Sequence, residues 1–107
     1  MNKYMFASEA AEELRKEIAY SAKQWGKYHA RQYRDALRQK IQTICQNPLL
    51  FPLRNDILTG IRISTFKGNR IVYTFIEEKK LVVILAILSI HQNIDESQLK
   101  KRRRKTH

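Results

Sequence analysis

Four cationic or titratable residues in the second half of the chain could together act on a phosphodiester. They are Arg62, Lys67, Arg70 and His91. Guanidinium groups fixed on a sheet can clamp a phosphate and stabilise the charge that develops there, and a histidine beside them can move a proton. This set would suit a metal-independent ribonuclease. The plainer interpretation is that the hairpin cations are solvated and that His91 is a surface residue at the end of a strand.

A second group of basic residues indicates an anionic partner. Between residues 23 and 70 the chain has ten lysines and arginines against two acidic residues, Asp35 and Asp56. Any one of these cations can be an ordinary solvated charge, but a cluster of like charges without neutralising partners repels itself. We therefore predict a surface that binds an acidic protein segment or nucleic acid. Its residues are Lys27, Arg31, Arg34, Arg38, Arg54, Arg62 and Arg70.

The overall composition excludes several other classes of protein. The 107 residues carry 21 Lys and Arg against 10 Asp and Glu, a formal net charge of +11, and this length suits one domain. The single cysteine, Cys45, rules out an internal disulfide and a cysteine-based zinc site, and we expect it to be a small buried apolar side chain. The sequence has no carboxylate pair, nucleophile elbow, glycine-rich phosphate loop or metal-ligand spacing, so we expect no metal and no cofactor.

The apolar segments are too short for a secretory signal or a membrane-spanning helix. Residues 1–7 lack the apolar stretch of a secretory signal. The most apolar run, Leu81–Ile90, is about half of the roughly 20 residues that a membrane-spanning helix needs. We therefore expect a soluble, cytoplasmic protein that does not associate with a membrane.

Two helices are predicted after a short strand over residues 3–7. In the first helix, capped by Ser8, an apolar stripe runs from Leu14 to Trp25, and we expect Trp25 to lie in the core. Gly26 allows the left-handed conformation that ends this helix.

The second helix carries the basic stripe beside an apolar one. Its predicted buried residues are Ala30, Tyr33, Leu37, Ile41 and Ile44, and the neighbouring cations are Lys27, Arg31, Arg34 and Arg38. The helix must end near Asn47, because Pro48 disfavours helical geometry in the residue before it. The two helices thus form a hairpin that must pack on something flat.

Three strands are predicted after a loop over residues 48–58. Residues 61–66 alternate in part, residues 67–69 form a turn, and residues 70–76 are rich in β-branched and aromatic side chains. After a polar turn over residues 77–80, the run from Leu81 to Ile90 is apolar on both faces, which favours the interior of the sheet. The order β-α-α-β-β-β predicts an α+β fold: an N-terminal helical hairpin packed on a mostly antiparallel four-stranded sheet.

We expect one domain over residues 1–99 and a basic tail over residues 100–107. The six residues Lys100–Lys105 are all Lys or Arg and carry +6 of the net charge. They show no apolar periodicity, so we expect the tail to be solvated, disordered and mobile. Such a run binds any polyanion in a salt-dependent way, and its role is left open.

These residues and elements together resemble the RelE/ParE superfamily of bacterial toxins from type II toxin–antitoxin systems. The resemblance extends from Tyr4 to about Ile94 and is closest to the ParE, or plasmid-stabilisation, branch. The segments that carry it are Trp25-Gly26-Lys27, Asn47-Pro48, Arg54-Asn55-Asp56-Ile57, Gly60-Ile61-Arg62, Phe66 to Tyr73 and the strand Val82 to Leu88. It implies the same β-α-α-β-β-β layout.

The resemblance also implies a growth-inhibiting toxin and its partners. ParE-like members bind and poison DNA gyrase, whereas RelE-like members cleave mRNA in the ribosomal A site with basic residues and often a late Tyr or His. Arg62 and Arg70 match basic positions of RelE-like toxins, but no tyrosine follows Tyr73 and only His91 could replace it. An ungapped match puts Ser89 where many ParE-like members have a histidine.

We therefore predict a ParE-like gyrase inhibitor that acts by binding and is not an enzyme. A cognate antitoxin, often acidic, would wrap its basic surface and form a hetero-oligomer with it. The alternative is a RelE-like, ribosome-dependent mRNA endonuclease that uses Arg62, Lys67, Arg70 and His91. A third possibility, a nucleic-acid-binding domain without toxicity, is disfavoured because the helical hairpin lacks a helix-turn-helix turn.

Overall fold

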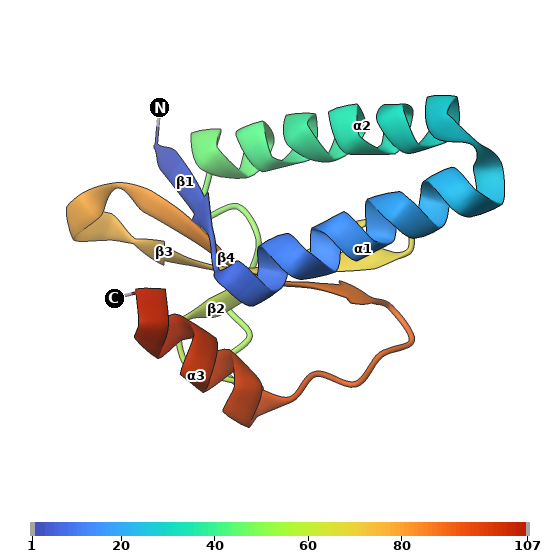
Figure 1. Cartoon of the computed structure of the whole chain (residues 1–107). Helices are drawn as coiled ribbons and strands as arrows, with labels where there is room; N and C mark the ends of the chain where they lie inside the picture. The colour runs from blue at the N-terminus through green and yellow to red at the C-terminus, as the bar shows by residue number, and fades with distance from the viewer. Residues whose placement is uncertain (1, 107) are drawn as a thin grey trace.

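The computed structural model describes residues 2–106 and has the predicted α+β fold. The elements are β1 (Lys3–Phe6), α1 (Ser8–Trp25), α2 (Lys27–Gln46), β2 (Ile61–Phe66), β3 (Asn69–Ile76), the 3-10 turn η1 (Glu77–Lys79), β4 (Leu81–Ser89) and α3 (Glu96–Thr106). The hairpin of α1 and α2 covers one side of the sheet, and α3 lies on the other side (Figure 1). Within residues 2–106, the helices are too short or too polar to cross a membrane.

The sheet has the strand order β1-β4-β3-β2. The first strand, β1, pairs in parallel with β4, whereas β4, β3 and β2 are antiparallel to their neighbours. Residues Val82 to Leu88 of β4 are all buried, which confirms the prediction that this apolar run lies inside the sheet.

Each face of the sheet has its own core. On the hairpin side, Ile71, Tyr73 and Ile84 pack with the apolar stripe of α2. On the α3 side, Ile61, Val72 and Leu85 pack with Leu58 and Leu99. This division follows from the alternation of side chains along a strand.

The second helix follows the sequence prediction closely. The buried residues on its apolar face are Ala30, Tyr33, Leu37, Ile41 and Ile44. Cys45 is also buried, at 1% exposure, and the helix ends at Gln46, just before Asn47 and Pro48. Gly26 joins the two helices with a φ of +96°, which favours glycine.

Two predictions at the ends of α1 are wrong. Trp25 is 69% exposed, because the tip of the hairpin projects beyond the sheet and leaves the last turn of the stripe without a partner (Figure 1). Ser8 is the first helical residue and Ala7 takes the capping position. The backbone N–H of Ala7 still donates to Ile84 in β4, so the chain leaves the sheet and enters the helix within one residue.

An ion pair completes the edge of β4 beyond β1. The pairing of β1 with β4 stops at Ile84, so the later residues of β4 have no strand on that side. There the N–H of Ile87 donates to Glu13 Oε1 at 3.1 Å, and the carbonyl of Leu85 accepts from Arg102 Nη1 at 3.0 Å. Arg102 also donates to both carboxylate oxygens of Glu13, at 2.9 and 3.0 Å.

The structure corrects the prediction of a disordered tail, because residues Lys100 to Thr106 form most of α3. The Asp95 carboxylate accepts from the first backbone N–H groups of the helix, and Leu99 is 2% exposed against the core. Arg102 and Lys105 bind carboxylates of α1 that lie 89 and 96 residues earlier in the chain. Periodicity within the segment cannot show such distant partners. His107 lies outside the described residues.

Candidate functional site

The structure does not gather the four residues proposed for phosphodiester chemistry. Lys67, Arg70 and His91 lie towards one end of the sheet, where the N–H of Ile90 donates to the carbonyl of Gly68. Arg62 is near the start of β2, five residues before Lys67, which is about 16 Å along an extended strand.

Arg62 and Arg70 also lie on opposite faces of the sheet. Arg62 is the cross-strand partner of Tyr73, which packs in the core under the helical hairpin. Arg70 is the partner of Leu88, which packs in the core on the α3 side. Because directly paired residues share a face, the two guanidinium groups cannot clamp one phosphate together.

Both guanidinium groups hold loops of the protein. Arg62 Nη1 donates to the carbonyl of Phe51 at 2.5 Å and to that of Leu49 at 3.4 Å. Arg70 Nη2 donates to the carbonyl of Ser89 at 2.9 Å and to that of Gln92. The structure therefore gives these arginines a positioning role in the segments before β2 and after β4.

Two further predicted site residues, His91 and Arg54, lie in loops. His91 is exposed after β4, and its backbone N–H donates to Ser89 Oγ at 3.2 Å. Arg54 makes two hydrogen bonds of 3.0 Å to the Asp56 carboxylate, and this guanidinium lowers the pKa of Asp56 from its ordinary value. Arg54 is thus partly neutralised by its own loop.

The basic stripe of α2 is exposed throughout. Its members are Lys27, Arg31, Arg34 and Arg38. Within residues 2–106 the stripe makes one ion pair, between Arg34 Nε and Asp35 Oδ1 at 3.7 Å, and both of these side chains are at least half exposed. Such a surface pair contributes little, so the stripe keeps most of its positive charge available for a partner.

Arg34 and Arg38 border an apolar groove of about 200 Å³, which we call the β1 groove. Its other lining residues are Tyr4, Phe6, Leu14, Ile18, Leu37 and Ile41. The adjoining strand β1 is an edge strand of the sheet. An apolar floor with two cations at its border suits an amphipathic segment that carries acidic residues.

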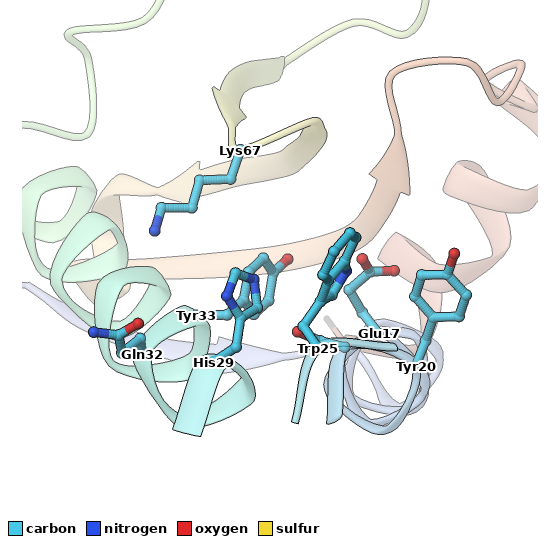
Figure 2. A pocket seen from close by; sticks show the side chains of 8 residues that line it. Glu17, Tyr20, Trp25, His29, Gln32, Tyr33 and Lys67 are labelled. Atoms are coloured by element: carbon cyan, nitrogen blue, oxygen red, sulfur yellow. The ribbon is translucent and has the colours of Figure 1, made fainter. Parts of the chain in front are cut away.

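A second pocket, which the sequence does not predict, lies at the tip of the helical hairpin (Figure 2). We call it the tip pocket. It has a volume of about 210 Å³ and is lined by Glu17, Tyr20, Ser21, Trp25, His29, Gln32, Tyr33 and Lys67. The available signal is the concentration of aromatic residues around Gly26, of which the apolar stripes assign Trp25 and Tyr33 to the core.

The sequence of this chain matches a known protein family over most of its length. The match is to the model described as ParE toxin of type II toxin-antitoxin system, parDE, and it spans residues 4–94. The chain belongs to the ParE toxin family. Its membership confirms the resemblance inferred from the Trp25-Gly26-Lys27 hairpin and the segments that follow, and the match ends two residues before α3 begins.

Solved structures of ParE and RelE proteins share the fold. A chain of the chromosomal ParDE toxin–antitoxin system from P. aeruginosa has 16% identity and a TM-score of 0.71, over 85% of this chain and 98% of that one. A chain of the intact E. coli RelBE toxin–antitoxin complex has 20% identity and a TM-score of 0.63, over 86% and 100% of the two chains. The isolated E. coli RelE toxin has 21% identity and a TM-score of 0.63, over 95% and 98%. No curated protein matches the chain in sequence.

Proposed function

We propose that this ParE-family chain inhibits DNA gyrase by binding it, and that an acidic antitoxin segment neutralises it from the β1 groove. Membership of a family of type II toxins supports the general role of a toxin. The related ParDE and RelBE structures are toxin–antitoxin systems, which supports an antitoxin partner for this chain. The proposed target would place its action in the cytoplasm.

The β1 groove supports the antitoxin part of the proposal. Its apolar floor would take the hydrophobic face of a peptide, and Arg34 and Arg38 would pair with carboxylates beside that face. Desolvated charge pairs of this kind can couple strongly, and the remaining stripe would attract an acidic segment over longer distances. The edge of β1 is next to the same groove.

The positions of the arginines support binding over RNA cleavage. Arg62 and Arg70 lie on opposite faces of the sheet and donate to backbone carbonyls of their own chain. A metal-independent ribonuclease needs its cations and its proton-transfer group around one phosphate. This separation is the observation that favours a gyrase-binding toxin over the RelE-like alternative.

Two assays on the purified chain test the target. We expect inhibition of gyrase supercoiling with accumulation of gyrase–DNA cleavage complexes. In a translating extract, 5′-end mapping should show transcripts without new cuts. Codon-phased cuts in the transcripts together with normal supercoiling would overturn the proposal and establish the RelE-like alternative.

A conservative variant sharpens the second assay. His91→Gln removes the proton-transfer group of the proposed nuclease set, and His91 is exposed and donates to Ser89 through its backbone N–H. On the gyrase proposal, this variant should leave growth inhibition within about twofold of the original chain. A loss of toxicity accompanied by a loss of transcript cutting would again favour the nuclease.

A further inference from the structure

The tip of the helical hairpin exposes an unusual amount of aromatic surface. Tyr20, Trp25 and Tyr28 are 58%, 69% and 73% exposed. The rings of Trp25 and His29 lie 5.9 Å apart at an interplanar angle of 44°. Large apolar side chains that gather on a surface without packing into the core are typical of a binding site. Here Trp25 and His29 form one wall of the tip pocket (Figure 2).

A lysine that lines the same pocket has an unfavourable backbone conformation. Lys67 and Gly68, between β2 and β3, have φ values of +44° and +80°. A two-residue hairpin turn with positive φ at both positions normally has Asn, Asp or Gly at the first one, so a lysine there is strained. Its side chain extends from the turn towards the side of the pocket lined by His29, Gln32 and Tyr33 (Figure 2).

The remaining lining residues offer both hydrogen-bond acceptors and donors. Glu17 contributes a carboxylate from α1, and Gln32 contributes a carboxamide from α2. Tyr33 accepts a 2.7 Å hydrogen bond from Asn69 Nδ2, and burial raises the pKa of Tyr33 to about 12. The pocket thus combines aromatic faces, a cation, a carboxylate and a neutral phenol.

We propose that the tip pocket binds one nucleotide of a single-stranded nucleic acid, with its base against Trp25 and His29 and its phosphate at Lys67. Aromatic side chains stack on unpaired bases, and adjacent cations bind the backbone. A volume of about 210 Å³ is below the roughly 300–1,000 Å³ of drug-sized sites, which suits a single base. This site lies apart from the β1 groove and adds to the proposed function.

The Glu17 carboxylate indicates which base fits best. A carboxylate repels phosphate but accepts hydrogen bonds from the N–H groups of a base edge. Guanine presents two neighbouring N–H donors on its Watson–Crick edge, which match the two oxygens of a carboxylate. We therefore use 5′-GMP as the matched mononucleotide probe and expect it to bind more tightly than 5′-UMP. Glu17→Gln should reduce this difference in affinity.

Trp25 provides a direct readout, because it is the only tryptophan in the chain. We expect 5′-GMP and a guanine-containing single-stranded RNA octamer to change its fluorescence in a saturable way. Calorimetry should show that Trp25→Ala weakens binding of the octamer about fivefold or more. The matched control is Tyr28→Ala, which removes a more exposed aromatic residue of the same tip that does not line the pocket. Both variants should keep the unfolding temperature of the original chain.

A pair of lysine variants separates a built site from general attraction to a basic protein. Lys67→Gln should weaken 5′-GMP binding several-fold and reduce the salt dependence of octamer binding by about 0.7 in slope. Lys27→Gln removes the same charge from the hairpin tip outside the pocket and should leave 5′-GMP binding unchanged. Equal losses in the two variants would overturn the proposal. Unchanged Trp25 fluorescence at millimolar 5′-GMP would also overturn the proposal, even if the addition of a gyrase subunit changed that fluorescence.

Discussion

The helices α2 and α3 are both strongly basic, yet their charges are used differently. In α3, Arg102 and Lys105 pair with carboxylates of α1 at 2.9 and 3.1 Å. In α2 the stripe has one long, exposed pair, between Arg34 and Asp35. The positive charge of α3 therefore holds the protein together in part, whereas that of α2 remains available to a partner. Net charge alone cannot distinguish these two uses.

Reversing charges on α2 and on α3 should have very different effects on the affinity for the antitoxin. We expect Arg34→Glu combined with Arg38→Glu to weaken binding of the cognate antitoxin at least a hundredfold, because both residues border the β1 groove. The control is Lys101→Glu combined with Arg104→Glu on α3, two exposed residues that make no ion pair within residues 2–106. That pair should change the affinity by less than about fivefold. Calorimetry with the antitoxin measures both, and similar losses would contradict the assignment of the groove.

The stability of the fold, in contrast, should depend on the ion pairs of α3. Arg102→Met leaves the Glu13 carboxylate, 23% exposed, and the carbonyl of Leu85 without their shared donor. We expect a loss of about 2 kcal/mol in the free energy of unfolding, measured with urea, because a partly buried charge is left unpaired. Lys105→Met breaks a more exposed pair and should cost less than about 1 kcal/mol.

A double-mutant cycle tests the cause of that loss. Glu13→Gln combined with Arg102→Met should be less destabilising than the sum of the two single changes. The reason is that the double variant leaves no buried charge without a partner. Strict additivity would mean that the two side chains act independently, and the described role of the pair would be wrong.

The smallest expected effect is a pH dependence carried by Glu9. A hydrogen bond from its own backbone N–H at the start of α1, followed by one from Lys105, lowers the pKa of Glu9 from 4.5 to about 2. A depressed carboxyl pKa stabilises the folded chain above the unfolded value, and the stabilisation is lost as the pH falls through the folded value. Glu9→Gln should therefore narrow the difference in urea midpoint between pH 5 and pH 2 relative to the original chain. An equal difference in the two proteins would contradict this role of Glu9.

Much of the fold could be predicted because its signals are local. The stripe from Ala30 to Ile44 and the apolar run of β4 reflect burial that neighbouring residues encode directly. Trp25 was misplaced because the stripe does not say where the supporting sheet ends. The pairing of α3 with α1 was missed because its partners are 89 and 96 residues away.

The site was harder to predict because it depends on strand register. A turn of residues 67–69 leaves the register open, whereas the observed two-residue turn at Lys67 and Gly68 pairs Arg70 with Thr65. Thr65 is three residues from Arg62, an odd number, so the two arginines must point to opposite faces. A difference of one residue in the length of this turn therefore decides whether Arg62 and Arg70 can face the same phosphate.

The parallel pairing of β1 with β4 has a consequence for the making of this protein. Lys3 pairs with Leu81, and Phe6 pairs with Ile84, so the first strand has no neighbour in the sheet until the last strand has been synthesised. Contacts of such long sequence separation form late, and chains grow at about 5–20 residues per second during synthesis. An incomplete chain that stops before β4 would lack one of the two interior strands of its sheet. We therefore expect translation to deliver the active fold only when the chain is nearly complete.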